Sequence, residues 1–271
     1  MRVLLTGAAG SIGRTLVSGL TDRGHRVVGL DMQPAPQGYD GSWHTADCTD
    51  PDAVAEVFDS ELVDAVVHLA GIADETSLPD ALTSHVISTG VLLDAMVAHG
   101  VTRMVYASSN HAVGRTPRSE LGDDLLTSEA PPRPDTFYGV AKVAAEALLR
   151  LYADRHAIDT IACRIGAFLQ QPESTRGLSV WLSPDDCLRM VHAALTAPAP
   201  GYVVLFGISA NTRRWWDLEP GRRLGYEPSD DAEVYAADIA PSPVDEMQAA
   251  YVGGFFAADR SVVRPAVDRR A

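Results

Sequence analysis

The sequence predicts an α/β protein in which helices cover both faces of a parallel sheet. Over the first two-thirds of the chain, short apolar runs rich in β-branched residues alternate with longer stretches of helical periodicity. A glycine-rich turn joins the first run to the first helical stretch, and after Ile165 proline and glycine interrupt the rhythm. The 271 residues fit a single domain, in which residues 1–165 mainly form the sheet layers and residues 166–271 mainly form a smaller C-terminal lobe.

The expected strands and helices alternate in the order of βαβ units. Strands are expected at Arg2–Thr6, Arg26–Asp31, Ala65–Leu69, Arg103–Ala107 and Thr160–Ile165. Helices are expected at Ser11–Arg23, Ala53–Phe58, Pro79–His99 and Tyr138–His156. Crossovers of this length connect parallel strands with right-handed topology.

One further helix is expected to begin in the lobe, at Ser183. This residue can serve as an N-cap, Pro184 suits the first turn, and Asp185 and Asp186 are favourable near the positive end of the helix dipole. The charged, proline-containing stretch from about Asp259 is expected to fray.

Charge and composition exclude several classes of partner. The formal net charge is −14 and the acidic residues are spread along the chain, so neither a nucleic acid nor a membrane is expected as a partner. No apolar run approaches the length needed to span a bilayer, and the N-terminus lacks the apolar segment of a secretory signal. Three widely spaced cysteines give neither a disulfide framework nor a metal-binding pattern. We therefore expect a cytoplasmic protein without a metal site.

The glycine-rich turn predicts a dinucleotide site. Gly7 permits a tight turn, Gly10 lets the backbone approach a pyrophosphate, and Gly13 allows close packing of the helix on the sheet. Free N–H groups at the helix start, from Ser11 and Ile12 onward, face the phosphate charge. The alternative is a strand-to-helix turn that binds no ligand. The location of the glycines directly after the first strand favours the dinucleotide site over this alternative. The sequence thus predicts a Rossmann-type, doubly wound sheet.

Other residues at strand ends extend this cofactor site. Asp31 ends the second strand, where a carboxylate accepts hydrogen bonds from the adenosine ribose and repels a 2′-phosphate, which favours NAD over NADP. A solvated turn aspartate is the alternative. Weaker patterns place Asp47 and Cys48 near the adenine, and the small residues of Leu69-Ala70-Gly71 where the sheet edge passes the dinucleotide.

Tyr138 and Lys142 lie four residues apart and therefore on one face of a helix. A phenol with a pKa near 10 is a poor base at neutral pH, but a neighbouring ammonium and a positively charged nicotinamide ring can lower that pKa. Lys142 is the only lysine in the chain, which otherwise uses arginine, and Ser109 lies at the end of a predicted strand about 30 residues earlier. The sequence predicts a proton-transfer site, with a surface ion-pairing position as the alternative.

Several motifs together resemble the extended short-chain dehydrogenases, most closely the bacterial uronate dehydrogenases. These motifs are TGAAGSIG, HLAG, YASSNH, YGVAK and RIG, and the resemblance covers nearly the whole chain. It implies a Rossmann domain with a small lobe, and oxidation of glucuronate or galacturonate at C1 to an aldarolactone with NAD. Ser109 would bind the reacting hydroxyl, Tyr138 would take its proton, and Lys142 would hold the nicotinamide ribose. Ile165 of RIG would line the cofactor site.

The resemblance also implies residues that bind the substrate. Asn110 and His111 of SSNH resemble substrate contacts, and Arg176 resembles the arginine that clamps the uronate carboxylate, a role that suits a planar guanidinium. A solvated loop arginine and a buried core histidine are the alternatives. The chain departs from the family pattern at Ala73 and Ala167, where serines are expected.

A third departure is His85, which stands where extended members carry a helix asparagine. Losing the two serine hydroxyls could shift substrate preference by several kcal/mol, because sites built to bind hydroxyls discriminate strongly. A nucleotide-sugar epimerase or dehydratase, and a non-catalytic sensor of the dinucleotide, are the competing functions. The resemblance further implies a homo-oligomer paired through the helices Pro79–His99 and Tyr138–His156.

Overall fold

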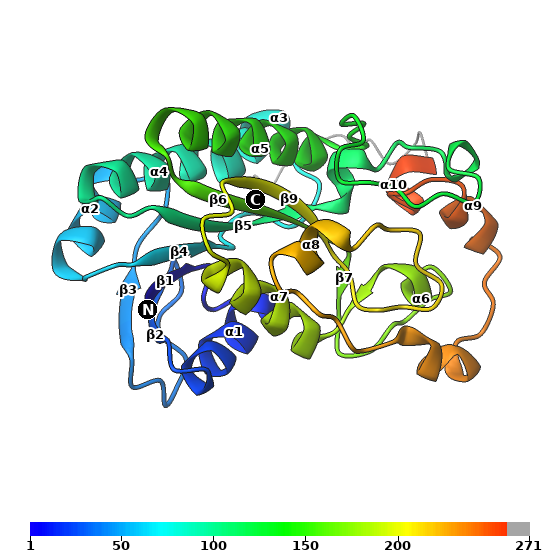
Figure 1. Ribbon diagram of the computed structural model, residues 1–271, viewed down its shortest axis with the longest axis horizontal. Helices are drawn as coiled ribbons and strands as arrows, with labels where there is room; N and C mark the ends of the chain where they lie inside the picture. The colour runs from blue at the N-terminus through cyan, green and yellow to red at the C-terminus, as the bar shows by residue number, and fades with distance from the viewer. Residues whose placement is uncertain (259–271) are drawn as a thin grey trace, which may run out of the picture.

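A seven-stranded parallel sheet forms the centre of the molecule (Figure 1). The computed structural model describes residues 1–258, so the expected fraying from Asp259 lies outside the described residues. The order of strands is β3-β2-β1-β4-β5-β6-β9. Their bounds are β1 Arg2–Thr6, β2 Arg26–Asp31, β3 Ser42–Thr45, β4 Ala65–His68, β5 Arg103–Ser109, β6 Asp159–Ile165 and β9 Tyr202–Gly207. The chain reverses its winding direction between β1 and β4, which creates a crevice at the carboxyl ends of these strands.

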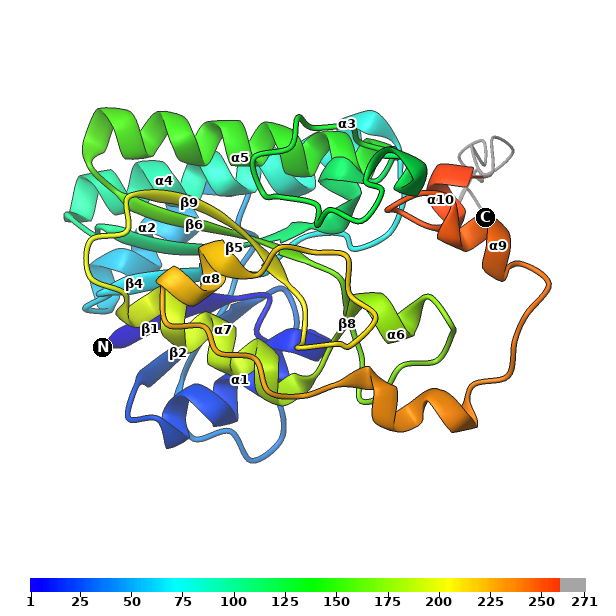
Figure 2. The ribbon, with the colours of Figure 1, turned by 45° about the vertical axis from the view of Figure 1, so that its right-hand side comes forward.

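Helices cover both faces of the sheet, as Figures 1 and 2 show from two directions. Their bounds are α1 Ser11–Asp22, α2 Pro51–Ser60, α3 Leu78–Leu82, α4 Ser88–His99, α5 Phe137–His156, α6 Gly177–Val180, α7 Pro184–Thr196, α8 Glu219–Arg223, α9 Asp245–Ala249 and α10 Phe255–Ala258. Apolar residues of α1 and α7 pack on one face, and those of α2, α4 and α5 pack on the other. The sheet is therefore buried on both sides, which explains its nearly continuous apolar strands.

The predicted strands and helices are confirmed with small shifts at their ends. β4 ends at His68 instead of Leu69, β5 continues to Ser109, and α5 begins at Phe137 behind the N-cap Thr136. The expected N-cap at Ser183 is confirmed, because its side chain accepts a hydrogen bond from the Asp186 amide. The helix that it starts belongs to the sheet layers.

The sequence analysis did not predict two strands of the large sheet or a small second sheet. β3 is a four-residue edge strand with a polar sequence, and β9 lies within the proline-interrupted part of the chain. β9 pairs with β6 from Tyr202 to Gly207, so the part after residue 166 completes the sheet as well as forming the lobe. The second sheet consists of β7 Ala167–Phe168 and β8 Trp181–Leu182.

The expected helix Pro79–His99 is helical from Leu78 to His99, but its middle part, Thr83–Ile87, forms a π-helical turn between α3 and α4. By length and composition, Leu78–His99 is long and apolar enough to cross a membrane, so the expectation that no run approaches that length is wrong. Leu92, Leu93 and Met96 of this stretch lie in the core under the sheet. A core helix of a globular protein meets the same criterion.

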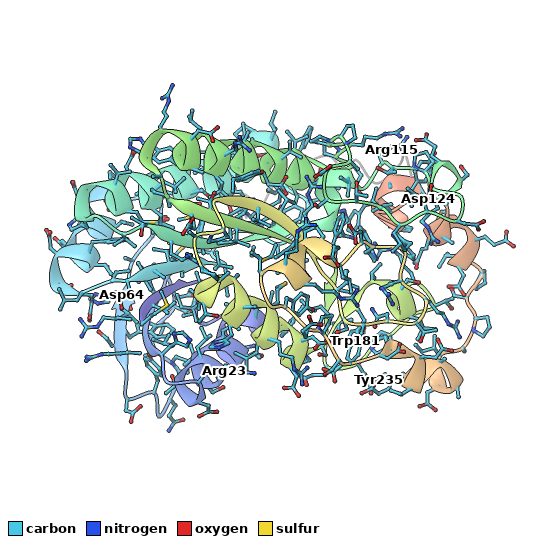
Figure 3. The ribbon with its side chains drawn as sticks, viewed as in Figure 1. Arg23, Asp64, Arg115, Asp124, Trp181 and Tyr235 are labelled. Atoms are coloured by element: carbon cyan, nitrogen blue, oxygen red, sulfur yellow. The ribbon has the colours of Figure 1, made fainter. Side chains whose placement is uncertain are left out.

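The lobe lies at the carboxyl end of the sheet, beyond β6 and β9 (Figure 2). Its larger apolar cluster includes Phe206, Trp215 and Trp216, and a smaller one surrounds Trp181. Trp181 and Tyr235, labelled in Figure 3, meet edge to face with ring centroids 5.7 Å apart. The lobe thus has apolar packing of its own beside the crevice.

Candidate active site

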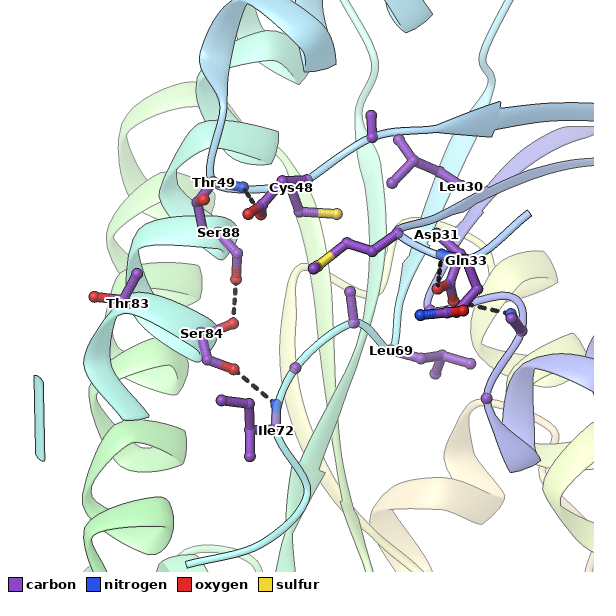
Figure 4. A pocket seen from close by; sticks show the side chains of 18 of the residues that line it. Leu30, Asp31, Gln33, Cys48, Thr49, Leu69, Ile72, Thr83, Ser84 and Ser88 are labelled. Carbon is purple, nitrogen blue, oxygen red and sulfur yellow. Dashed lines mark hydrogen bonds between the residues drawn. The ribbon is translucent and has the colours of Figure 1, made fainter. Parts of the chain in front are cut away.

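A cavity of about 630 Å³ opens at the carboxyl ends of β1, β2 and β4 (Figure 4). This is the position where open parallel sheets bind their ligands. The structure brings together here eight of the residues expected to contact the cofactor: Gly7, Gly10, Asp31, Asp47, Cys48, Leu69, Ala70 and Gly71. Three turns that are distant in sequence therefore share one wall.

The glycine turn has the shape that a dinucleotide requires. Gly7 has a φ of +68°, and a Cβ there would lie 2.7 Å from the Ala70 nitrogen. A Cβ at Gly13 would lie 2.3 Å from the Gly7 carbonyl oxygen, so the absence of a side chain lets α1 pack against the turn. These contacts confirm a tight turn at Gly7 and close helix packing at Gly13.

The start of α1 leaves its first N–H groups available to an anion. Gly10 is the N-cap and offers no side chain to cap the helix, and its own amide donates to the Gly7 carbonyl at 3.0 Å. Ser11 is exposed at the helix start, and Ile12 packs its side chain against the core. The backbone N–H groups of these two residues are therefore free to meet a phosphate at this helix end.

Asp31 lies in the cavity wall as expected, although both of its oxygens already have partners. One oxygen accepts from the Ala9 amide and the other from the Gln33 amide, each at 2.9 Å. These bonds fix the carboxylate at the end of β2 beside the glycine turn. A carboxylate oxygen has more than one lone pair, so ribose hydroxyls can still donate to it.

Tyr138, Lys142 and Ser109 converge at the ends of α5 and β5. Lys142 Nζ donates to the Ala107 carbonyl at 2.6 Å and lies 5.3 Å from the Tyr138 ring centroid. It also lies 4.7 Å from the Tyr106 ring, an ammonium contact with an aromatic face. Ser109 is buried, and its hydroxyl donates to Asn110 and accepts from the His111 amide. The predicted helical juxtaposition is confirmed.

The expected electrostatic effect on the phenol is not found among the groups of the protein. Burial raises the pKa of Tyr138 above its usual value of 10, hydrogen bonding with Ser109 lowers it, and the Asp74 charge raises it. Burial also lowers the pKa of Lys142 to about 7, which weakens its charge at neutral pH. Burial therefore dominates the pKa of Tyr138 in the protein alone, and the combined effect of the ammonium and a positively charged nicotinamide ring stays a prediction.

A buried ion pair supports this site, and sequence reasoning missed it. Glu146, one helical turn after Lys142, accepts from Arg164 Nη2 at 2.8 Å and from Ser108 Oγ at 2.5 Å. All three side chains are almost completely buried. The signal was present in the sequence, because an arginine within an apolar strand and a glutamate on the inner face of a helix each require a partner. The pair ties α5 to β5 and β6.

Glu75 is a second residue that sequence reasoning missed. Its two carboxylate oxygens accept from the backbone amides of Phe137 and Tyr138 at 3.0 and 3.1 Å. A negative charge is favourable at the N-terminus of α5. This contact could not be predicted from a local sequence pattern, because 62 residues separate Glu75 from the helix.

His111 joins the phenol to the lobe. Its ring lies 5.9 Å from that of Tyr138 and 5.5 Å from that of Phe256, both edge to face. Nδ1 pairs with the fully buried Asp135 carboxylate at 2.9 Å. His111 is partly exposed, so the alternative of a buried core histidine is not what the structure shows.

Arg176 lies beneath the C-terminal segment Val252–Gly254. Its Nη2 donates to the Val252 carbonyl at 2.8 Å, and its Nε has no hydrogen-bond partner among residues 1–258. Burial lowers the pKa of Arg176 to about 10, which the Asp135 carboxylate opposes. Asp135 therefore faces both His111 and Arg176, and the solvated-loop alternative for Arg176 does not hold.

The remaining predicted residues lie around the same end of the sheet, and only Asn110 among them has a side-chain hydrogen bond, the one that it accepts from Ser109. Ile165 is buried at the end of β6 beside Ser109, and Ala167 lies in β7 against the lobe core. Asn110 is buried behind Ser109, whereas Ala73 is exposed in the loop after β4. Neither alanine can hydrogen-bond a ligand through its side chain.

Fold and site together define a dinucleotide-dependent enzyme of the Rossmann type. The model of the NAD dependent epimerase/dehydratase family matches residues 3–169. The uronate dehydrogenase of Pseudomonas syringae pv. tomato is 36% identical over 263 residues, which cover 95% of this chain and 93% of that protein. The chain therefore belongs to the NAD-dependent epimerase/dehydratase family.

Solved structures agree with this assignment. A mutant of the uronate dehydrogenase of Agrobacterium tumefaciens, solved in complex with NAD, is 34% identical with a TM-score of 0.87, covering 95% of this chain and 97% of its own. The glucuronic acid dehydrogenase of Chromohalobacter salexigens is 33% identical with the same TM-score and the same coverage. The observed fold and the cradle at Gly7–Gly13 fit NAD, the cofactor that the family implies.

Proposed function

We propose that this protein oxidises an acidic aldose, a uronate such as glucuronate or galacturonate, at C1 with NAD. The observation that supports an acidic substrate is Arg176, whose partly buried guanidinium lies near the same aspartate as His111, which in turn contacts Tyr138. A planar guanidinium matches a carboxylate, whereas a neutral sugar offers it no anionic group. The near full-length similarity to uronate dehydrogenases supports the same assignment.

The chemistry removes a proton and a hydride from the substrate. Tyr138 Oη takes the proton of the C1 hydroxyl, and Ser109 holds that hydroxyl in place. NAD, when bound, accepts the hydride from C1, so that C1 becomes the carbonyl carbon of a lactone. Lys142 holds the cofactor ribose and adds positive charge near Tyr138 when protonated. Asn110 and His111 contact the sugar, and Ala73 and Ala167 leave two hydroxyls of the usual hexuronates without partners.

The cofactor residues have matching roles. Gly10, Ser11 and Ile12 offer backbone N–H groups to the pyrophosphate, and Asp31 accepts from the adenosine ribose. Further along the cavity, Asp47 and Cys48 line the adenine end, and the turn Leu69–Gly71 lines the path toward the nicotinamide. Ile165 packs beneath this path.

The experiment is a substrate panel with NAD in which NADH formation is followed by its absorbance. We expect turnover with glucuronate or galacturonate and much slower turnover with glucose, galactose and glucose 6-phosphate. Turnover of neutral sugars without any on uronates would overturn the proposal. Conversion of a UDP- or dTDP-sugar without net NADH would instead support the epimerase alternative, which the near full-length dehydrogenase relatives do not favour.

We also propose a cytoplasmic homo-oligomer. The three cysteines are free and buried, as expected for a reducing compartment. Ile87, Val97, Val140 and Leu151 expose between 38% and 52% of their surface along the stretch Thr83–His99 and helix α5. A second copy of the chain would cover these apolar side chains. Light scattering coupled to size-exclusion chromatography tests this assembly.

A further inference from the structure

The turn Leu69–Ile72 is held by two consecutive residues of the π-helical turn. The Ile72 amide donates to Ser84 Oγ at 2.7 Å, and His85 Nε2 donates to the Ile72 carbonyl at 2.9 Å. Both residues belong to the π-helical turn Thr83–Ile87, a kind of turn that is rare and often lies at functional sites. Both polar groups of Ile72 are therefore satisfied by this short segment.

His85 also contacts the residue expected to act as the base. Its ring meets that of Tyr138 edge to face, with centroids 5.1 Å apart. Only 2% of His85 is exposed. His85 therefore lies between Ile72, which lines the cofactor cavity, and Tyr138.

One nitrogen of this buried ring has no partner. Because the Ile72 carbonyl can only accept, His85 Nε2 carries the proton and the neutral ring presents a lone pair at Nδ1. Burial lowers the pKa of His85 to about 3, which keeps the ring neutral at physiological pH. Among residues 1–258, nothing hydrogen-bonds to Nδ1. A buried acceptor without a donor costs free energy, so a ligand that supplies the donor is favoured.

The surroundings of Nδ1 point to a ligand in the cavity. A Cβ at Gly71 would lie 2.5 Å from Nδ1, so a side chain at residue 71 would cover this atom. Gly71, Ile72, Ser84 and Ser88 all line the cavity. The glycine, whose φ is +151°, therefore keeps the approach to Nδ1 clear of side-chain atoms.

We propose that His85 is a cofactor-binding residue whose Nδ1 accepts a hydrogen bond from the nicotinamide-riboside half of NAD. This half carries hydroxyl and carboxamide donors, and it is the half that must reach Tyr138. The adenosine half is assigned to the opposite end of the cavity, at Asp31 and Cys48. The inference rests on the NAD site and not on the identity of the sugar, so its test uses no sugar.

The test compares the binding of NAD with that of ADP, which lacks the nicotinamide riboside, by calorimetry. We expect His85→Phe, which keeps the aromatic contact with Tyr138 and removes both nitrogens, to weaken NAD about tenfold and ADP less than twofold. We expect His85→Asn, which can donate to Ile72 and accept from the ligand, to restore most of the NAD affinity. The matched control is Ser84→Ala, which removes the other bond to Ile72 but leaves Nδ1 in place. It should not produce an NAD-selective loss.

A second measurement keeps the proposal falsifiable if His85→Phe does not fold. The ¹⁵N signal of His85 Nδ1 in the wild-type protein should move when NAD is added and stay unchanged with ADP, as expected for an acceptor that gains a donor. Three results would each overturn the proposal. They are equal losses of NAD and ADP affinity in His85→Phe, an NAD-selective loss in Ser84→Ala as large as that in His85→Phe, and an Nδ1 signal that does not move when NAD is added.

Discussion

The cofactor side and the substrate side of the crevice are constructed in different ways. On the cofactor side, Gly7 and Leu69 follow directly after strands and Asp31 ends one, and parallel strands bring their carboxyl ends to one edge. On the substrate side, Arg176 meets Val252 across 76 residues of sequence. The first half is therefore encoded by local spacing, and the second by contacts that only the folded lobe creates.

The C-terminal segment illustrates the second kind of construction. Val252 and Gly253 donate from their amides to the Thr116 and Gly114 carbonyls, and Arg115 donates to the Ala257 carbonyl. This pairing carries Phe256 to His111 and the Val252 carbonyl to Arg176. The residues proposed to bind the substrate are thus held by a part of the chain that the cofactor side does not use.

The largest expected effect comes from Tyr138→Phe, at the point where the two sides meet. Removing the proton acceptor should lower kcat about 10³-fold with the best uronate, because general-base catalysis typically contributes 10²- to 10⁴-fold. Steady-state kinetics by NADH absorbance measures this loss. A loss below threefold would move the proton chemistry to another residue.

Glycine substitutions sharpen the account of the cofactor side. Gly13→Ala should destabilise the fold by about 3 kcal/mol, because the new Cβ would lie 2.3 Å from a backbone oxygen. Gly10→Ala is the matched variant, since Gly10 has a φ of −70° and its Cβ would lie 3.2 Å from the Gly7 oxygen. It should fold normally and bind NAD at least tenfold more weakly.

Thermal unfolding and NAD calorimetry distinguish these two outcomes. If Gly13→Ala were as stable as the wild-type protein, the close packing of α1 on the turn would be contradicted. If Gly10→Ala bound NAD normally, the approach of the pyrophosphate to this residue would be contradicted.

Acid should destabilise the core beneath the cofactor side through His68. Burial lowers the pKa of His68 to about 3. Between pH 6.5 and 3, His68 is therefore protonated in the unfolded chain and neutral in the folded chain. Stability therefore falls as the pH drops below 6.5, by up to about 1.4 kcal/mol per pH unit for this group. Urea unfolding at pH 7 and pH 5 measures the loss.

His68→Phe removes this titration and serves as the comparison. It is expected to be less stable at pH 7, because the Thr6 hydroxyl, 2.7 Å from His68 Nδ1, loses a partner. Its loss between pH 7 and pH 5 should nevertheless be smaller than that of the wild-type protein by about 2 kcal/mol. Equal losses in the two proteins would show that His68 does not contribute to acid sensitivity.

The smallest expected effect separates the substrate side from general backbone strain. Gly254 has a φ of +68°, and a Cβ there would lie 2.5 Å from Arg176 Nε. Gly254→Ala should therefore raise KM for the uronate about tenfold by displacing the guanidinium, with kcat nearly unchanged. The matched control is Gly225→Ala, where φ is +91° and nothing lies within 4 Å of the new Cβ.

Both variants should lose about 1–2 kcal/mol of stability, because an alanine disfavours left-handed backbone. Only Gly254→Ala should change KM. A rise in KM with Gly225→Ala as well would mean that strain, and not the contact with Arg176, sets the affinity for the substrate.

The sequence predicted the fold and the cofactor side well, because both depend on the spacing of apolar residues and on the glycines and prolines between the elements. The glycine turn, Asp31 and the Tyr138–Lys142 spacing are local features, and the structure places all of them at one edge of the sheet. β3 was missed because a short, polar edge strand such as Ser42–Thr45 has no apolar pattern. β9 was missed because its apolar run lies within a region dominated by turns.

Contacts that depend on the folded chain could not be predicted in the same way. Glu75 reaches the start of α5 from a loop 62 residues away, and Asp135, directly before the N-cap of that helix, pairs with His111 of another segment, so no spacing in the sequence identifies either contact. The effect of Lys142 on Tyr138 was predicted from proximity alone. Burial, which the sequence does not reveal, dominates both pKa values.

The most direct test of the proposed function compares glucuronate with glucose, two aldoses that differ at C6, in the wild-type protein and in Arg176→Gln. The account predicts that kcat/KM for glucuronate falls about 100-fold, since breaking a buried charge pair costs 2–5 kcal/mol, while kcat/KM for glucose stays within threefold. Arg150→Gln, which changes an exposed arginine on α5, should alter neither value. Equal losses for both sugars, or none for glucuronate, would contradict the assignment of Arg176 to the substrate carboxylate.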